Sequence, residues 1–191
     1  EVQHVEELGV AIHLNAHAGR DFTIDDLFNR GFDAVFIGIG AGKPSTLAVP
    51  VHIEGSDEVL MSDKGMPGVR HATHFLRRVQ MNREGHMDAQ EIDVKPGDKV
   101  FVVGCGNTAI DAARTAFRLG AGSVEIIYRR TIEKMAALRA EYDDAVKEGV
   151  TFNWNSNITE MSVDSGRKLK SIVIETKEPD KEASRRTAEA D

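Results

Sequence analysis

The sequence predicts an α/β protein built on a parallel β-sheet. The first observation is a recurring order of helix, glycine and apolar strand. The glycines that end the helical stretches are Gly9, Gly31, Gly120 and Gly149. The second is a strand, a glycine-rich turn and a helix that follow one another directly from Lys99 to Phe117. Since strands that alternate with helices need crossover connections, both observations favour parallel strands.

The composition fits a globular protein and excludes several classes of function. Of 191 residues, 41% are hydrophobic and 29% are charged, with a net charge of −7. This balance argues against nucleic acid or an anionic membrane as the main partner. No apolar run approaches the roughly 20 residues that span a bilayer and no signal peptide opens the chain, so we expect a cytoplasmic protein. The only cysteine, Cys105, leaves no disulfide within the chain and no thiolate cluster for iron–sulfur or zinc.

The first forty residues predict two pairs of helix and strand. Val2, Val5 and Leu8 have helical spacing, so the chain begins inside a helix. Thr23 and Asp26 match a capping box in which Asp replaces Glu or Gln. The expected elements are a helix over 2–8, a strand over 10–14, a helix over 25–30 and a strand over 32–37.

A glycine-rich turn and a long loop follow. Gly38, Gly40 and Gly42 end the strand, and together with Pro44 they also explain an ordinary exit from a strand without any ligand. Residues 45–70 carry prolines and glycines without periodic apolar positions, which predicts a loop that links two domains.

A connecting helix over 71–83 leads towards the second domain. His71 and His74 lie one turn apart and could bind a metal ion as a pair. No third ligand has suitable spacing, so solvated or hydrogen-bonded histidines are the simpler interpretation and no metal site is assigned. The turn at Lys95-Pro96-Gly97 then delivers the chain into the central strand.

The centre of the sequence carries the dinucleotide-binding fingerprint, with alanine in its third position. After the apolar run Val100–Val103, Gly104 allows a sharp turn, Gly106 lets a pyrophosphate approach the backbone, and Ala109 lets helix and strand pack closely. The helix begins near Asn107 and Thr108. Its free N–H groups and positive dipole end are expected to face the phosphates.

The end of the next strand, 123–128, indicates which nucleotide is bound. NAD-binding proteins usually place Asp or Glu there to hold the ribose 2′-hydroxyl, whereas this chain has Arg129 and Arg130. A guanidinium binds a 2′-phosphate that a carboxylate would repel, so the sequence favours NADP. The alternative is that both arginines are merely solvated.

The remaining sequence predicts one more crossover and a hairpin. Apolar positions on one face predict a surface helix, and two later apolar runs flank a short polar turn. The tail has no large apolar side chain, which predicts disorder. The expected elements are a helix over 137–148, strands over 150–154, 158–163 and 169–176, and a disordered tail over 178–191.

A family resemblance rests on VVGCGNTAIDAARTAFRLGAGSVEIIYRRT and the following region of Met135 and Glu141. These residues are similar to the NADPH-binding domain of the glutamate synthase small subunit. The wider group includes the ferredoxin-NADP transhydrogenase large subunit, dihydropyrimidine dehydrogenase and adrenodoxin reductase. Residues 32–44 resemble the part of the FAD domain that precedes the crossing into the NADPH domain. The chain departs from the family at Ile39, where Thr is usual, and at Ala136, where Pro is usual.

The resemblance implies a domain division and a set of cofactor contacts. Residues 1–50 would be a fragment of an FAD-binding domain, 51–95 a linker with the connecting helix, and 96–177 a Rossmann-like, three-layer NADPH-binding domain with a β-meander. Glu141 would contact the nucleotide, or would be a solvated helix residue. The other implied contacts are Gly104, Gly106, Asn107, Thr108 and Ala109 to the pyrophosphate, Arg129 and Arg130 to the 2′-phosphate, and Gly38, Gly40 and Gly42 to FAD.

The implied activity is transfer of electrons from NADPH through FAD to a further acceptor. An iron–sulfur protein or the glutamate synthase large subunit would be the partner, together with the rest of the FAD domain. Since this chemistry belongs to the cofactors, no catalytic acid or base is assigned. The first FAD turn and the segment for the ribityl chain are absent from the sequence, so we expect a piece of a longer flavoprotein that is inactive alone. The alternatives are a flavin-free NADP-dependent dehydrogenase and a regulatory module that binds the nucleotide without reaction.

Overall fold

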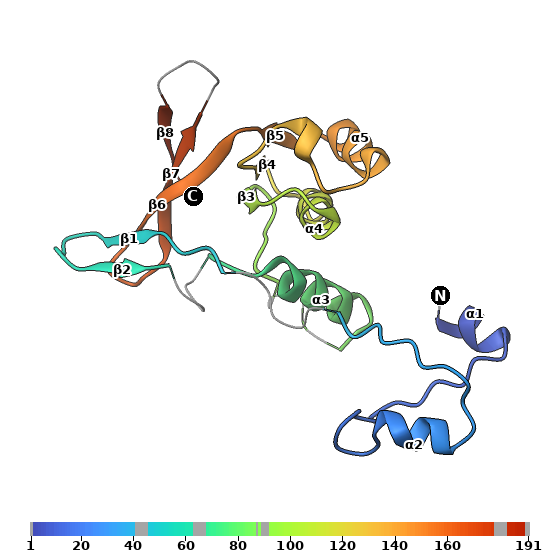
Figure 1. Cartoon of the computed structure of the whole chain (residues 1–191). Helices are drawn as coiled ribbons and strands as arrows, with labels where there is room; N and C mark the ends of the chain where they lie inside the picture. Colours follow the sequence, from blue (N-terminus) through green and yellow to red (C-terminus); the bar gives the residue numbers. More distant parts are fainter. Residues whose placement is uncertain are drawn as a thin grey trace. The chain divides into compact units, whose positions relative to one another are not determined.

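The computed structural model describes residues 2–40, 46–62, 68–86, 88, 92–177 and 183–189 (Figure 1). The chain divides into two compact units, an N-terminal unit, Glu1–Lys43, and a C-terminal unit, Pro44–Asp191. No helix in the described ranges combines the length and the apolar character needed to cross a membrane.

The N-terminal unit contains two short helices, α1 (Val2–Glu7) and α2 (Ile24–Asn29). Both confirm the helices expected from the sequence. The capping box at the start of α2 is also confirmed. The N–H of Asp26 donates to Oγ1 of Thr23 at 3.2 Å, and the N–H of Thr23 donates to Oδ2 of Asp26 at 2.8 Å. Each residue therefore satisfies a backbone donor of the other.

The two strands expected in this unit are wrong. Residues 10–14 and 32–37 belong to no strand of the described chain, and their apolar side chains except Val35 are exposed, Phe36 to 95%. No described residue of the N-terminal unit is buried. A strand is stabilised by hydrogen bonds to a neighbour and by burial of one face. Apolar spacing alone supplies neither.

The C-terminal unit contains the expected parallel sheet. The strands β3 (Lys99–Val103), β4 (Ser123–Ile127) and β5 (Thr151–Asn153) pair in the order β3-β4-β5, with Val100 opposite Val124. Two helices, α4 (Asn107–Arg118) and α5 (Arg139–Glu148), form the crossovers, and α3 (Ala72–Arg83) packs against α4. The predicted α/β class, the connecting helix and both crossovers are confirmed.

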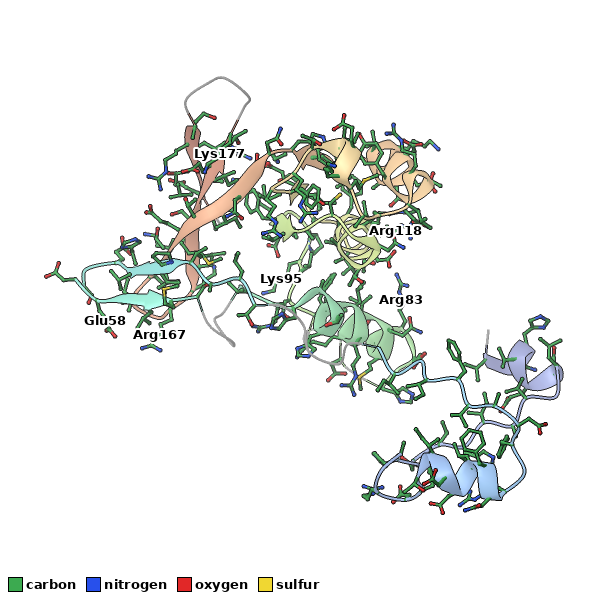
Figure 2. All side chains as sticks on the ribbon, viewed as in Figure 1. Glu58, Arg83, Lys95, Arg118, Arg167 and Lys177 are labelled. Carbon is green, nitrogen blue, oxygen red and sulfur yellow. The ribbon has the colours of Figure 1, made fainter. Side chains whose placement is uncertain are left out.

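A second sheet of five strands has the order β2-β1-β6-β7-β8. Its strands are β1 (Pro50–Ile53), β2 (Val59–Met61), β6 (Ser156–Val163), β7 (Leu169–Thr176) and β8 (Ser184–Glu189). The β1–β6 pair is parallel and the other pairs are antiparallel. The expected hairpin of β6 and β7 is confirmed. Figure 2 labels Arg167 in the turn that joins them.

The two faces of the parallel sheet bury different apolar clusters. Val124 and Ile126 pack in one cluster with residues of α3, α4 and α5. The alternate residue Ile127 packs in the other cluster with Val51, Val163 and Ile174 of the five-stranded sheet. Successive side chains of a strand point to opposite faces. The unit therefore has three layers, which are helices, parallel sheet and mixed sheet.

The structure corrects the sequence prediction at both borders of this unit. The loop expected over 45–70 contains β1 and β2, and Val51 of β1 is fully buried. The disordered tail expected over 178–191 contains β8, which pairs with β7 along its length. Strand β8 has only Ala188 packed against an apolar cluster. Backbone hydrogen bonds and the ion pairs Arg185–Glu160 and Arg186–Glu125 hold it in place. The pattern of apolar residues in the sequence does not indicate such contacts.

Candidate functional site

The carboxyl ends of β3 and β4 meet at the glycine-rich turn. Gly104 directly follows β3 and has a φ of +112°, in the left-handed region where a side chain is strained. Its N–H donates to the carbonyl oxygen of Ile127 at 3.0 Å. The turn is therefore fastened to the end of the neighbouring strand, immediately before the segment that carries Arg129 and Arg130.

The amino end of α4 has unsatisfied donors. The N–H groups of Ala109 and Ile110 donate to the carbonyl of Gly106 at 2.9 and 3.1 Å. Those of Asn107 and Thr108 have no acceptor among the described residues, and no side chain caps the helix. The first turn of a helix with free N–H groups and a positive dipole end favours an anion.

The space in front of this turn is open at Gly106. The residue has a φ of −96° and a ψ of 173°, which any residue can adopt. A Cβ placed there would meet no atom within 4 Å. The fold of the described chain therefore does not require a glycine at position 106. Ala109, in contrast, is buried, and its Cβ lies 4.0 Å from the position that a Cβ on Gly104 would take.

Arg129 and Arg130 lie just beyond β4 and are both exposed. In the part of the chain that the structure describes, neither guanidinium has a hydrogen bond or an ion pair. Other arginines of this unit are engaged, Arg114 and Arg118 with acidic residues of α5 and Arg186 with Glu125. Two cations near the anion-favouring turn are therefore available to a ligand.

Cys105 lies inside the turn and is only 2% exposed. Burial raises the pKa of its thiol to about 11, so the side chain stays neutral at physiological pH. Its carbonyl oxygen accepts hydrogen bonds from the N–H groups of Ala136 and Ala137 at 3.2 and 3.1 Å. The role of Cys105 is thus to fill the turn and to hold the segment before α5.

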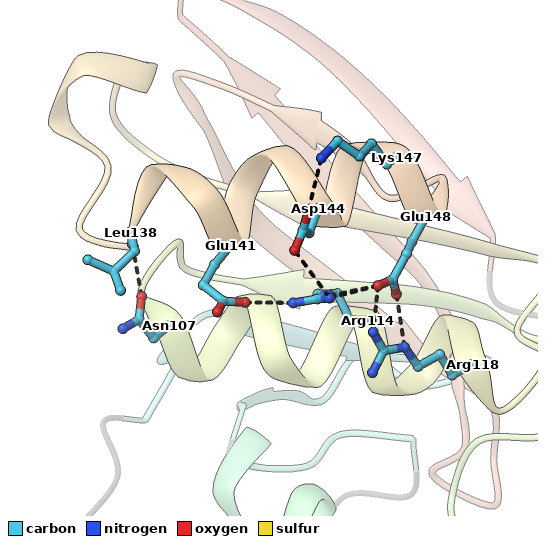
Figure 3. A network of polar contacts seen from close by, with 8 residues as sticks. All are labelled: Asn107, Arg114, Arg118, Leu138, Glu141, Asp144, Lys147 and Glu148. Atoms are coloured by element: carbon cyan, nitrogen blue, oxygen red, sulfur yellow. Dashed lines mark hydrogen bonds and ion pairs between the residues drawn. The ribbon is translucent and has the colours of Figure 1, made fainter.

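Glu141 of α5 is partly exposed and pairs with an arginine of α4. Its Oε2 accepts a hydrogen bond from Nη1 of Arg114 at 2.6 Å (Figure 3). The same guanidinium donates from Nε and Nη2 to Oε1 of Glu148, at 3.0 and 2.8 Å. Arg118 also donates to Glu148, and the hydrogen bonds from Arg118 and Arg114 lower the pKa of that carboxyl group. These contacts join α4 to α5.

We expect Arg114→Met to lower the free energy of unfolding by about 1–3 kcal/mol, because Arg114 is 17% exposed and its loss leaves Glu141 without its arginine partner and Glu148 with Arg118 alone. Urea denaturation measures this loss.

The contribution of this interaction depends on pH. Because the folded state lowers the pKa of Glu148, the interaction stabilises the protein above about pH 4.5 and is lost as the pH falls through the folded-state pKa. The difference between variant and wild type should therefore narrow in acid. The control is Arg139→Met, since Arg139 is 66% exposed and its pair with Asp143 is worth at most about 0.5 kcal/mol. Equal destabilisation by both variants would contradict the argument.

The contact of three glycines with a flavin stays a prediction. Gly38 and Gly40 are exposed in the N-terminal unit, where Gly40 has a φ of +68°, and Gly42 lies outside the described residues. Asp111 of α4 is exposed and has no polar partner in the described chain.

Sequence reasoning missed one polar contact at the site. Oδ1 of Asn107 accepts a hydrogen bond from the N–H of Leu138 at 3.0 Å (Figure 3). The resemblance assigned Asn107 to the pyrophosphate only. No local signal in the sequence links these two residues, because the spacing between them depends on how α5 packs beside α4.

Comparison with known proteins shows the family of the chain. The family model for pyridine nucleotide-disulphide oxidoreductases matches residues 9–186. The chain is 35% identical over 188 residues to the NADP(+)-dependent formate dehydrogenase subunit beta of Moorella thermoacetica, covering 97% of this chain and 24% of that protein. It is 33% identical over 190 residues to the NADPH-Fe(3+) oxidoreductase subunit beta of Geobacter sulfurreducens, covering 97% and 25%. It is 32% identical over 184 residues to the glutamate synthase [NADPH] small chain of Escherichia coli, covering 94% and 36%.

The chain therefore spans between 24% and 36% of the length of these relatives. The family model, in contrast, matches nearly all of the chain, from the N-terminal unit to strand β8. The chain belongs to the pyridine nucleotide-disulphide oxidoreductase family.

Proposed function

We propose that residues 96–177 bind NADPH and form the pyridine-nucleotide module of a flavin-dependent oxidoreductase. The observation that carries this proposal is the pair of unengaged guanidinium groups, Arg129 and Arg130, one strand away from the free N–H groups of α4. An anionic ligand with two separated phosphate groups matches both features.

Each phosphate of NADPH has a matching group in the chain. The pyrophosphate would lie on the open turn at Gly106, against the N–H groups of Asn107 and Thr108. The 2′-phosphate would lie on Arg129 and Arg130, whose planar donors form charge-assisted hydrogen bonds to phosphate oxygens. Gly104 and Ala109 would shape the turn and its packing. Any contact of theirs with the pyrophosphate would come from the backbone.

The wider activity is part of the same proposal. The module would serve the transfer of a hydride from NADPH to FAD, and its own residues would bind and orient the nucleotide. Residues 1–50 would belong to the flavin domain, with Gly38, Gly40 and Gly42 beside the flavin. The names of the relatives, which are subunits of NADPH-dependent enzymes, support a partner subunit or domain as the onward electron acceptor.

The test is calorimetric titration of the chain with NADPH and with NADH. We expect NADPH to bind roughly ten- to a hundredfold more tightly, because only NADPH offers a phosphate to the two arginines. Equal affinities, or binding of neither nucleotide, would contradict the proposal. A parallel titration with FAD tests the flavin contact separately, because it involves the other unit.

A further inference from the structure

The segment from Arg129 to Leu138 carries both arginines and has little structure of its own. Its only regular element is one turn of 3-10 helix, Ile132–Lys134. A segment of this kind takes its position from hydrogen bonds to its neighbours, because it buries few apolar side chains of its own. The position of the two guanidinium groups therefore depends on the points at which the segment is fastened.

The beginning and the middle of the segment are fastened to the sheet. The N–H of Asn155, which follows β5, donates to the carbonyl of Arg130 at 3.1 Å. The N–H of Ser156 donates to the carbonyl of Tyr128 at 2.9 Å. The hydroxyl of Tyr128 donates to the carbonyl of Lys134 at 2.7 Å. None of these three hydrogen bonds involves the last residues of the segment, directly before α5.

The glycine-rich turn itself holds that end. The carbonyl of Cys105 accepts from the N–H groups of Ala136 and Ala137, and Oδ1 of Asn107 accepts from the N–H of Leu138 at 3.0 Å. The acceptors flank Gly106 on its two sides. Asn107 is the only side chain among them, so it is the one contact that a substitution can remove without altering the backbone. Leu138 is the N-cap residue of α5, and its own side chain makes no capping hydrogen bond.

We propose that Asn107 is a positioning residue that sets the preference for NADPH over NADH by holding the arginine segment at a fixed place relative to the pyrophosphate turn. The inference rests on the proposed function. Within one nucleotide the pyrophosphate and the 2′-phosphate lie at a limited range of separations. A segment fastened to the turn presents its guanidinium groups to the 2′-phosphate before the ligand arrives, whereas a loosened segment must be ordered during binding.

The test compares Asn107→Ala with Asn107→Asp in titrations with NADPH and NADH. The carboxylate of Asp keeps an acceptor for the N–H of Leu138, and Ala removes it. We expect Asn107→Ala to reduce the ratio of the two affinities by about five- to tenfold, in line with the loss of one hydrogen bond. We expect Asn107→Asp to keep the wild-type ratio, because its added negative charge acts on both nucleotides through the shared pyrophosphate.

A second measurement is independent of the ligand. Hydrogen exchange of the peptide covering residues 131–138 should become faster in Asn107→Ala and stay near the wild-type rate in Asn107→Asp. Exchange in β6 and β7 should stay unchanged in both variants, which shows that the fold is intact.

The outcomes separate this inference from the proposed function. If the wild-type chain does not prefer NADPH, the proposed function fails. If it does, but Asn107→Ala weakens both nucleotides by the same factor, Asn107 acts only as a pyrophosphate contact and the inference is overturned. Loss of the preference in Asn107→Asp as well, with normal exchange of residues 131–138, would also overturn it.

Discussion

Gly106→Val is expected to abolish the binding of both NADPH and NADH, with a loss of affinity on the order of a hundredfold or more. The isopropyl group would fill the open space in front of the turn, where a Cβ meets no atom of the described chain within 4 Å. The pyrophosphate, which both nucleotides share, needs that volume. The N–H groups of Asn107 and Thr108 would then be out of its reach.

The same variant should fold nearly as well as the wild type. The backbone at Gly106 has a φ of −96°, so a side chain adds no strain there. The residue stands at the cap of α4, where valine costs about 0.5–1 kcal/mol relative to glycine. Circular dichroism during thermal unfolding, run beside calorimetry on the same sample, measures both properties.

Two further variants control the experiment. Gly106→Ala should weaken binding by an intermediate amount, because its methyl group fills less of the space. Gly166 lies in the exposed turn between β6 and β7, and like Gly106 it has no positive φ. Gly166→Val should therefore leave nucleotide binding unchanged. Normal binding of NADPH by Gly106→Val would show that the glycine-rich turn is only a structural turn.

Arg129→Ala/Arg130→Ala is expected to remove the preference for NADPH. The loss of charge-assisted contacts to the 2′-phosphate should cost about 1.5–3 kcal/mol in NADPH binding, or roughly ten- to a hundredfold in affinity. NADH should bind nearly as before, since it has no 2′-phosphate. Stability should hardly change, because neither side chain has a polar partner in the described structure. Titration of the variant with both nucleotides checks the ratio.

The matched control removes two positive charges elsewhere. Arg167→Ala/Lys168→Ala changes the net charge equally, in the turn between β6 and β7. It should leave the ratio of the affinities unchanged. A preference for NADPH that survives in the first variant would mean that the two arginines do not select the nucleotide. A preference that disappears in the control would mean that overall charge contributes to it. Raising the salt concentration should weaken NADPH binding more than NADH binding, because the additional contact is electrostatic.

The central crossover was predictable because its signals are local. The apolar run Val100–Val103, the fingerprint glycines and the helical spacing after Asn107 all lie within one short stretch, and β3, α4 and β4 follow them closely. The cap at Thr23 was predictable for the same reason. Periodicity and turn chemistry describe residues whose partners lie within about four positions.

Elements that depend on distant partners were not predictable in this way. Strand β1 is four residues long, too short to show alternation, and its burial results from pairing with β6 far along the chain. Strand β8 has Ala188 as its one apolar residue and is held by its backbone and by Arg185 and Arg186. Residues 32–37 show the opposite case, in which an apolar stretch has no neighbouring strand to pair with among the described residues.

The candidate site shows the same difference between local signals and contacts of distant residues. The positions of the turn and of the two arginines could be predicted from the sequence, because the fingerprint and the strand end have fixed spacing. Their contact with a nucleotide stays a prediction. The pairing of Glu141 with Arg114 and that of Asn107 with Leu138 could not, since each joins α4 to α5 or its cap across a crossover. Only the packing of the two helices brings these groups together.

Ile127 is buried in the cluster of the five-stranded sheet, although it ends the strand that leads to Arg129. We therefore expect opening of the five-stranded sheet to displace the arginines, because it would expose this side chain at the end of β4. A ligand held by Arg129 would oppose that opening by mass action, by about 2.7 kcal/mol at a concentration a hundred times its Kd. Strands that never touch the nucleotide would thus gain protection from its binding, and substitutions in the distant apolar cluster would reduce affinity without altering any contact to the ligand.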